Sequence, residues 1–448
     1  MKSLFNNMFL IALLVIVLAS CQENGEYEDV ITDGSYQTAA QIRLTNVIIH
    51  DIFSPPVASR IYAYPSIAAY EVAVLADPQY KSMMGQLNGF EKRDFEVPED
   101  VYLPLASLAA YYKTATALIF SEEKMTSHRD MAFEEIRKKG VPKKVFQKSV
   151  AFGEEVAEHV IEYSKKDNYH QSRSFEKYTV SNDPNTWQPT PPAYMEGIEP
   201  HWNKIRPFAL DSAGQFKSVP PTEFSNDPSS LFYKEAEEVF HTINNLTDEQ
   251  KDIAFFWDCN PYKVNVKGHV MFAEKKITPG GHWMGIASIA AKADGRDWKG
   301  TAEALALTSV ALFDGFIACW DEKYRSVLIR PETYINKYID EDWLPLLQTP
   351  PFPEYTSGHS VISNAASKTL TKIFGEPFHI VDSTEVAYGL PIREFESFRQ
   401  AADEAAISRL YGGIHYMPAI VHGSTKGQKV GEHLLGKVST KTENLAEN

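Results

Sequence analysis

Three short segments in the last third of the chain carry the residues best suited to chemistry. They are KYRSVLIRP at 323–331, PEYTSGH at 353–359 and SRLYGGIH at 408–415. Together they supply three fixed cations, one hydroxyl group, one glycine amide and two imidazoles. This set of groups suits a tetrahedral oxyanion, either phosphate or vanadate. The choice between these two ions separates a phosphatase from a peroxidase.

The first segment predicts two cations on one side of a helix. Lys323 and Arg330 are seven residues apart, which is two helical turns. Pro331 indicates that this helix ends near Arg330. Taken alone, the pair would be explained as solvated surface cations. Because the pair directly follows an apolar helical segment at 301–320, we favour the interpretation that an anion lies between them.

The second segment predicts an anion site at the start of a helix. The turn before that helix contains Ser357, Gly358 and His359, and the helical pattern stops at Gly375. Free N–H groups and the helix dipole favour an anion there. Gly358 allows close approach to the backbone, Ser357 adds a hydroxyl donor, and His359 adds an acid–base group. The simpler alternative is that Thr356 or Ser357 only caps the helix.

The third segment predicts a helix end followed by a re-aimed histidine. Arg409 and His415 are six residues apart, so they cannot face one point from a straight helix. Gly412 and Gly413 are expected to end the helix between them. Taken alone, His415 would be explained as a core or surface histidine. The three segments together favour a single oxyanion site.

The elements that must position these groups are expected to be mostly helices. Apolar residues recur at helical spacing from about residue 36, and sustained two-residue alternation is absent, so strands should be few. Residues 175–225 contain eight prolines, with Trp187 and Trp202 among them, which predicts an ordered coil packed over the helical body. We therefore expect an N-terminal helical half with this coil at 36–229 and a C-terminal half at 230–440.

The composition excludes some classes of protein. The 448 residues can form a large core, and a net charge of −15 argues against nucleic acid as a partner. Two cysteines beyond Cys21 do not make a disulfide framework. Cys319 is expected to be buried and reduced, and the sequence predicts no role for Cys259.

The N-terminus predicts export. Lys2 precedes an apolar run at 9–18, and Leu18-Ala19-Ser20-Cys21 resembles a bacterial lipobox. The resemblance implies a signal peptide at 1–20, a lipid on Cys21 and a tether at 21–35, hence an exported bacterial lipoprotein, periplasmic or anchored at the outer membrane or cell surface. The alternatives are a plain secretory signal or a cytosolic protein with an apolar start. No segment after Cys21 is expected to cross a membrane.

Taken together, the three motifs resemble the superfamily of vanadium-dependent haloperoxidases and type 2 phosphatidic acid phosphatases. The family pattern is a K-x6-RP segment, a PSGH segment and an SR-x5-H segment, and here Thr356 replaces the usual proline. This resemblance implies a mostly α fold built around two four-helix bundles, joined here by the long Pro-rich connection.

The resemblance also implies roles for the individual residues. In the peroxidase His415 would be bonded to vanadium, and in the phosphatase it would be the nucleophile. His359 would be the acid–base residue in either enzyme, and Lys323 would also polarise the bound peroxide. The groups expected to bind the oxyanion oxygens are Lys323, Arg330, Ser357, Gly358 and Arg409.

Four features favour the peroxidase over the phosphatase. Trp320 stands three residues before Lys323, and PPFP at 350–353 resembles the haloperoxidase lead-in. The phosphatases usually carry an aspartate where this chain has Ala419, which leaves the second nitrogen of His415 to a partner such as a backbone carbonyl. Lipid phosphatases of this type are also integral membrane proteins. Within the family, the chain looks most like the vanadium iodoperoxidases of marine flavobacteria.

This resemblance implies vanadate as cofactor, with phosphate as a competitor, and hydrogen peroxide and halide as substrates. Tyr262, Trp320 and Phe352 are candidates for the halide pocket, with plain packing as the alternative for each. Algal bromoperoxidases place a histidine at the position of Phe352, and the less polar phenyl ring here suits iodide, although chloroperoxidases also carry phenylalanine. The competing functions are an acid phosphatase and a lipid-anchored oxyanion-binding protein. The oligomeric state is not predicted.

Overall fold

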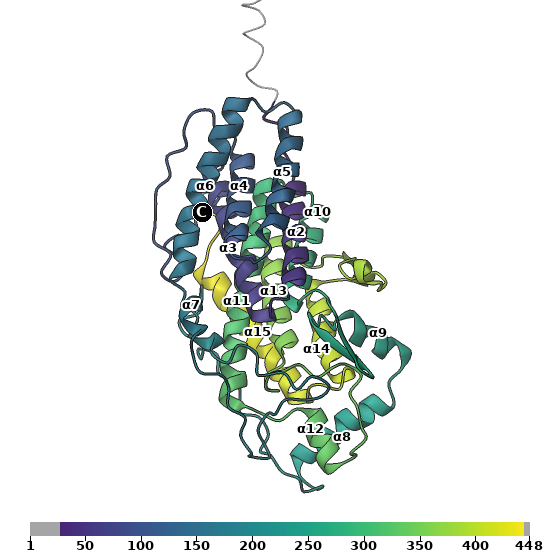
Figure 1. The fold of residues 1–448 in the computed structure, drawn as a ribbon. Helices are drawn as coiled ribbons and strands as arrows, with labels where there is room; N and C mark the ends of the chain where they lie inside the picture. The colour runs from purple at the N-terminus through teal and green to yellow at the C-terminus, as the bar shows by residue number, and fades with distance from the viewer. Residues whose placement is uncertain (1–26, 443–448) are drawn as a thin grey trace, which may run out of the picture.

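A computed structural model describes residues 27–442 of the chain (Figure 1). The expected signal peptide, Cys21 and the first part of the tether lie outside the described residues. The division of the chain at residues 229 and 230 stays a prediction.

The described part is mostly helical, as expected. Its N-terminal part contains α2 (Ser35–Asp51), α3 (Pro55–Leu75), α4 (Leu103–Thr116), α5 (Glu122–Lys138), α6 (Lys143–Lys165), α7 (Tyr169–Ser172) and the 3-10 turn η1 (Trp202–Lys204). Its C-terminal part contains α8 (Leu231–Asn244), α9 (Asp248–Phe256), α10 (Pro279–Ala293), α11 (Trp298–Ser326), α12 (Pro331–Tyr338), α13 (Gly358–Phe374), the 3-10 turn η2 (Val386–Tyr388), α14 (Phe398–Tyr411) and α15 (Met417–Lys437).

The strands are few and short, as expected. β1 (Lys263–Lys267) pairs antiparallel with β2 (Val270–Glu274), in a register that places Lys263 opposite Glu274. β3 (Ile380–Asp382) pairs antiparallel with β4 (Arg393–Phe395), in a register that places Ile380 opposite Phe395. Each pair is a separate two-stranded sheet, and Ile380 and Phe395 of the second pair belong to the principal hydrophobic core.

The long helix α11 is the centre of the core. It packs against α3 on one side and against α13 on another, and Figure 1 shows it running through the middle of the molecule. Its residues from Thr301 to Trp320 are all buried, which confirms the expected apolar central helix. The principal hydrophobic core contains residues of α3, α4 and α6 as well as α11 and α13, so the two halves share it.

The expectation that no segment after Cys21 is long and apolar enough to cross a membrane was wrong. Within residues 27–442, α11 alone is long and apolar enough to cross a membrane by length and composition, although no segment after Cys21 was expected to be. The apolar window of this helix is wholly buried inside the protein. A helix that is apolar on every face is also what a large helical core requires.

The Pro-rich stretch is an ordered coil, as predicted. Trp187 and Trp202 are both fully buried. The coil also pairs with the chain just after α11, because the Trp187 N–H donates to Val327 O at 2.8 Å and the Ile329 N–H donates to Asn185 O at 2.9 Å. The coil therefore fixes the path of the first predicted motif.

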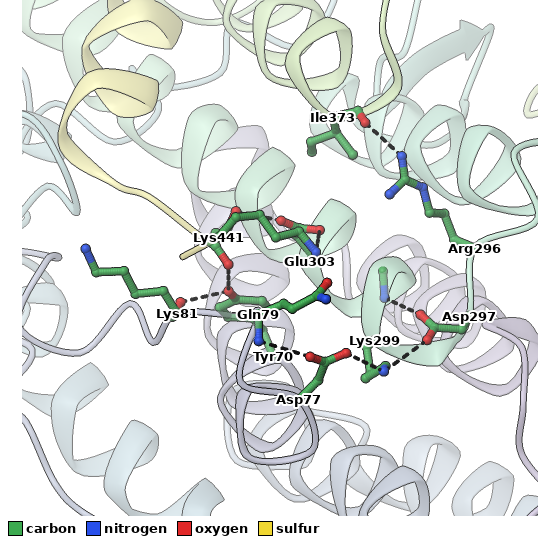
Figure 2. A network of polar contacts seen from close by, with 12 residues as sticks. Tyr70, Asp77, Gln79, Lys81, Arg296, Asp297, Lys299, Glu303, Ile373 and Lys441 are labelled. Carbon is green, nitrogen blue, oxygen red and sulfur yellow. Dashed lines mark hydrogen bonds and ion pairs between the residues drawn. The ribbon is translucent and has the colours of Figure 1, made fainter. Parts of the chain in front are cut away.

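The C-terminal segment is attached to the start of α11 through polar contacts (Figure 2). Lys441 pairs with Glu303 at 3.3 Å, and Lys299 pairs with Asp77 at 2.8 Å. Tyr70 donates its hydroxyl hydrogen to Lys81 O at 2.8 Å. These contacts join the end of the chain, the end of α3 and the beginning of α11.

Candidate active site

The three predicted motifs come together where four helices begin or end. Lys323 lies in the last turn of α11, and Arg330 immediately precedes α12. Ser357 is the N-cap of α13, and Arg409 lies in the last turn of α14. His415 lies in the turn between α14 and α15, as predicted for a residue beyond the two glycines.

The predicted path of the first motif was wrong. The helix that carries Lys323 ends at Ser326, and Val327 adopts a left-handed conformation with φ of 47°. Arg330 is in extended backbone, so it does not share a helical face with Lys323. The two cations meet because the chain turns between them. Contacts with the Pro-rich coil favour this turn over continuation of the helix.

Main-chain carbonyl groups hold the cations in place. Lys323 Nζ donates to Pro353 O at 2.9 Å and to Glu354 O at 3.0 Å. Arg330 Nε donates to Phe352 O at 2.9 Å. Three consecutive carbonyl groups thus face two cations. The PPFP sequence suits this purpose, because three of its four residues lack an N–H and fix their own φ angles.

The remaining arginine contacts connect the cations to other loops. Arg330 Nη1 donates to Ile414 O at 2.7 Å, directly before the site histidine. Arg409 Nη1 donates to Trp257 O at 2.8 Å, in the loop after α9. Both guanidinium groups are therefore oriented by backbone atoms and keep N–H groups for a ligand.

His415 is oriented by a buried carboxylate, not by a backbone carbonyl. Its Nδ1 lies 2.8 Å from Glu354 Oε1, which also accepts from the Tyr416 N–H at 3.0 Å. The Glu354 contact places the imidazole hydrogen on Nδ1. His415 Nε2 then carries the lone pair, and Arg330 Nη1 lies 3.2 Å from it. Nε2 is the atom that can bind the central atom of an oxyanion.

Sequence analysis missed this role of Glu354, although the residue lies inside the second motif. The sequence feature that could have revealed this role is a glutamate directly after Pro353, in a stretch that is otherwise apolar or small. The carboxylate also fills the role that an aspartate at position 419 would have filled. Ala419 instead uses its backbone carbonyl, which accepts from the Ser357 N–H at 3.1 Å.

Ser357 caps α13 and directly precedes Gly358, which lines the pocket. Its Oγ accepts from the Ser360 N–H at 3.3 Å and from the Ser360 hydroxyl at 2.8 Å. Because Oγ is the acceptor in both bonds, its own hydrogen remains available to an anion. The helix continues to Phe374 and ends at Gly375, as predicted. The capping alternative and the binding interpretation are therefore compatible.

Several buried polar atoms at the site have no hydrogen-bond partner within the described residues. They are Arg330 Nη2, Arg409 Nε, His359 Nε2 and Glu354 Oε2. Buried polar atoms in folded proteins nearly always have a partner. Arg330 Nη2 and Arg409 Nε are cationic donors, which an anion bearing several oxygens would satisfy, whereas His359 Nε2 and Glu354 Oε2 are acceptors.

The electrostatics of the site point to the same kind of ligand. Burial, together with the nearby charge of Arg330, lowers the pKa of Lys323 to about 7. Burial, together with the nearby charge of Arg409, lowers the pKa of Arg330 to about 10. Burial raises the pKa of Glu354 to about 7. Three buried cations with one nearby carboxylate repel one another unless an anion joins them.

His359 is held in its neutral form. Burial is the main cause that lowers its pKa well below the usual value, and the charge of Arg409 adds to it. The backbone of Trp257 opposes this shift. A neutral imidazole with a partner-free Nε2 is a proton acceptor at neutral pH.

A pocket of about 80 Å³ opens beside these groups. Gly358, His359, Arg409 and His415 line its polar end. All three halide candidates also line it, together with other aromatic and proline side chains. The candidates are Tyr262, Trp320 and Phe352.

Phe352 separates the apolar part of this pocket from the cations. The centre of its ring lies 5.0 Å from Lys323 Nζ and 5.1 Å from Arg330 Cζ. Trp320 lies against Phe352 with ring centres 5.0 Å apart and donates through Nε1 to Ile198 O at 3.1 Å. Trp320 is buried, whereas Tyr262 is only half-buried. Trp320 and Phe352 therefore pack against each other and also line the pocket.

The chain is similar over nearly its whole length to one solved structure, described as the first bacterial vanadium-dependent iodoperoxidase. The two share 52% sequence identity with a TM-score of 0.86, over 92% of this chain and 98% of the other. The chain belongs to the vanadium-dependent haloperoxidase family. Two distant structures show the same fold, the holo and apo forms of a bacterial vanadium-dependent chloroperoxidase. Their identities are 15% and 16%, their TM-scores 0.65 and 0.64, and each covers 86% of this chain and 93% or 94% of its own.

A family model for the second helical-bundle domain, VCPO_2nd, matches residues 303–444. This range contains all three motifs of the haloperoxidase. No curated protein sequence matches the chain. Family membership implies vanadate as the cofactor and peroxide and halide as substrates.

Vanadate fits the residues of this haloperoxidase. The partner-free Arg330 Nη2 and Arg409 Nε are donors for its oxygens, and His415 Nε2 offers a lone pair. A side chain at position 358 would lie 3.8 Å from the Trp320 ring, in ordinary contact, so the glycine keeps the start of α13 open on that side. The donor set is therefore cationic, preorganised and incomplete without an anion.

Proposed function

We propose that this haloperoxidase is an iodide peroxidase, which uses hydrogen peroxide to convert iodide to hypoiodous acid. The similarity to a structure described as an iodoperoxidase supports this choice of halide. The aromatic rings of Trp320 and Phe352 in the pocket support it as well, because they suit a large, polarisable and weakly hydrated anion.

The proposed roles follow from the contacts described above. Vanadate, when bound, supplies a Lewis acid that activates hydrogen peroxide without changing its own oxidation state. Lys323, Arg330 and Arg409 compensate its negative charge, with Ser357 Oγ and the Gly358 N–H as further donors. The observation that carries the proposal is the pair of partner-free guanidinium nitrogens beside the lone pair of His415 Nε2.

His359 is proposed to move the proton. Its neutral Nε2 accepts a proton from hydrogen peroxide, and the imidazolium then returns the proton as hypohalous acid and water are formed. Lys323 is hydrogen-bonded to two carbonyl groups and keeps one N–H that would be free to donate to a bound oxygen. Overall, one iodide, one peroxide and one proton give one hypoiodous acid and one water.

An acid phosphatase is the second candidate function. The observation that favours it is the bond between His415 Nδ1 and Glu354, because a carboxylate in that position also activates a nucleophilic histidine. Because Glu354 already orients His415, the absence of an aspartate at position 419 no longer argues against a phosphatase. The same pocket would then bind a phosphate ester, with His415 Nε2 attacking phosphorus.

Two assays on vanadate-free protein separate these functions. We expect triiodide to form from iodide and peroxide only after orthovanadate is added, and p-nitrophenyl phosphate to remain intact. His415→Ala is expected to lose both vanadate binding and triiodide formation while remaining folded. Full peroxidase activity in that variant would exclude His415 as the vanadium ligand. Phosphate release that vanadate inhibits would instead establish the phosphatase.

The halide preference needs its own comparison. We expect kcat/KM for iodide to exceed that for bromide by at least about a hundredfold, which corresponds to about 3 kcal/mol in the transition state. Equal values for the two halides would refute the proposed specificity while leaving the haloperoxidase assignment intact.

We also propose that the protein is an exported lipoprotein anchored through Cys21. The support is the sequence Leu18-Ala19-Ser20-Cys21 after the apolar run. Metabolic labelling with an alkyne fatty acid should mark the wild-type chain and fail to mark Cys21→Ser. Equal labelling of the two chains would remove the proposal.

A further inference from the structure

A second cluster of chemically reactive side chains lies beside the pocket. Cys259 follows α9, His282 lies in the first turn of α10, and Glu385 immediately precedes η2. All three are buried, with 2%, 0% and 1% of their surface exposed. They come from three segments that are separated by up to 126 residues in the chain. The sequence predicted no role for Cys259.

The three side chains direct one ligand atom each toward a common point. Cys259 Sγ lies 3.4 Å from His282 Nδ1 and 3.9 Å from Glu385 Oε1. His282 Nδ1 lies 3.4 Å from Glu385 Oε1. A small ion in tetrahedral geometry, at about 2.3 Å from sulfur and about 2.0–2.1 Å from nitrogen and oxygen, requires about 3.3–3.6 Å between its ligand atoms. The observed triangle is close to that size.

The far side of the imidazole has the partner that metal-bound histidines usually have. His282 Nε2 lies 2.8 Å from Asp382 Oδ2, and Asp382 is itself fully buried. Asp382 Oδ1 is fixed in turn by the N–H and hydroxyl of Thr384 at 3.0 and 2.7 Å. A carboxylate on Nε2 keeps the hydrogen on that nitrogen, so the Nδ1 lone pair faces the cysteine and the glutamate.

Hydrogen bonds alone allow two arrangements of this triangle. With its hydrogen on Nε2, the imidazole can accept one S–H hydrogen at Nδ1, and the Glu385 oxygen then faces a lone pair. The other possibility is an imidazolium ion shared between two carboxylates. A divalent cation would instead satisfy all three ligand atoms at once and offset the buried negative charges.

We propose that Cys259, His282 and Glu385 bind a zinc ion, with Asp382 as the positioning residue on Nε2. A thiolate, an imidazole and a carboxylate together suit zinc, whereas calcium and magnesium prefer sets made only of oxygen. The fourth position belongs to a water molecule. Its ligands are different residues from those of the oxyanion site, although Cys259 lines the same pocket.

The zinc site would stabilise the wall of the active-site pocket. The Trp257 ring stacks on His282 with centres 4.4 Å apart and planes inclined by 16°. The Trp257 carbonyl accepts from Arg409, and Cys259 itself lines the pocket. An ion that joins the loop after α9 to α10 (Figure 1) and to the residue before η2 would therefore hold the acceptor that orients Arg409.

The test is metal analysis of the purified full chain, followed by substitution with cobalt. We expect one zinc ion per chain after dialysis against zinc and removal of the excess. In the cobalt-substituted protein we expect a thiolate-to-cobalt charge-transfer band in the near ultraviolet. Cys259→Ser should lose this band, and Asp382→Asn should bind zinc about 10–100-fold more weakly.

Cys319→Ser is the matched control. Cys319 is also a buried free cysteine, but its Sγ lies beside Thr356 O at 3.6 Å and not beside the cluster. We expect this variant to keep both the zinc and the cobalt band. Because Cys259→Ser could fail to fold, the wild-type stoichiometry decides first. Less than about a tenth of an ion per chain in folded wild-type protein, or a cobalt spectrum without thiolate character, would overturn the proposal.

Discussion

Replacing Glu354 tests whether the carboxylate on His415 controls binding of the cofactor. Glu354→Gln keeps the size of the side chain and one oxygen that can accept from His415 Nδ1 and the Tyr416 N–H. It removes the charge. A charged hydrogen bond contributes about 1.5–3 kcal/mol and a neutral one about 0.5–1.5 kcal/mol, so the loss is about 1–1.5 kcal/mol. Orthovanadate should therefore bind about five- to tenfold more weakly.

Glu354→Ala should have a larger effect. It leaves the imidazole without a partner at Nδ1, so the ring can turn or change tautomer and withdraw the Nε2 lone pair from the site. Loss of a partner behind a metal-bound histidine typically weakens metal binding about 10–100-fold. The ordering of the two variants matters more than either value. If Glu354 had a purely structural role, vanadate affinity would fall in each variant only in proportion to its loss of folding stability.

The assay is calorimetric titration of vanadate-free protein with orthovanadate, with recovered triiodide formation as a second readout. Glu303→Gln is the matched control, because Glu303 is also a buried glutamate and accepts from Thr440 Oγ1 at 2.6 Å at the other end of α11. That variant should bind orthovanadate as the wild type does. If both Glu354 variants are folded and bind within twofold of the wild type, the carboxylate does not position His415.

Two further predictions concern pH and packing. Because burial lowers the pKa of Lys323 to about 7, its ammonium form predominates below that pH and is lost as pH rises. Orthovanadate affinity should therefore fall about tenfold per pH unit above about pH 7.5, with proton uptake in calorimetry. Lys323→Arg should flatten this profile after correction for vanadate's own ionisation. A methyl group at Gly427 would lie 2.1 Å from Val361 O, so Gly427→Ala should lower the free energy of unfolding by about 1–3 kcal/mol or more in urea. Gly436→Ala, on the same helix with nothing within 4 Å, should be neutral or up to about 1 kcal/mol stabilising, and equal losses in the two variants would contradict the packing argument.

The sequence predicts the groups of the site well because their chemistry depends on residue type and order. The helix over 301–320, the stop at Gly375 and the helix end before Gly412 follow from local signals, and the structure has all of them. The ordered coil was predictable because prolines exclude a helix and tryptophans favour burial.

The turn between Lys323 and Arg330 could not be predicted from local preference. Val327 is β-branched, and a left-handed conformation is costly for such a residue. Its N–H donates to Lys323 O and its carbonyl accepts from the Trp187 N–H, both at 2.8 Å. The second partner lies about 140 residues earlier in the chain, so tertiary contact decides this conformation.

Glu354 and the zinc cluster were missed for a related reason. A glutamate in a loop is usually solvated, and only the packed structure shows that Glu354 is fully buried against His415. Cys259, His282 and Glu385 are far apart in the chain and match no short metal-binding motif. Convergence of distant residues is a property of the fold, not of spacing.

The same carbonyl contacts explain how a pocket can hold three buried cations before any anion arrives. Lys323 donates to Pro353 O and Glu354 O, and Arg330 donates to Phe352 O and Ile414 O. These bonds offset part of the cost of burying the charges and fix their directions, so little reorganisation is required when an oxyanion binds. The cost that remains appears as the lowered pKa values of Lys323 and Arg330. It is released on binding, so the strain of the cation cluster favours tight retention of a multiply charged oxyanion.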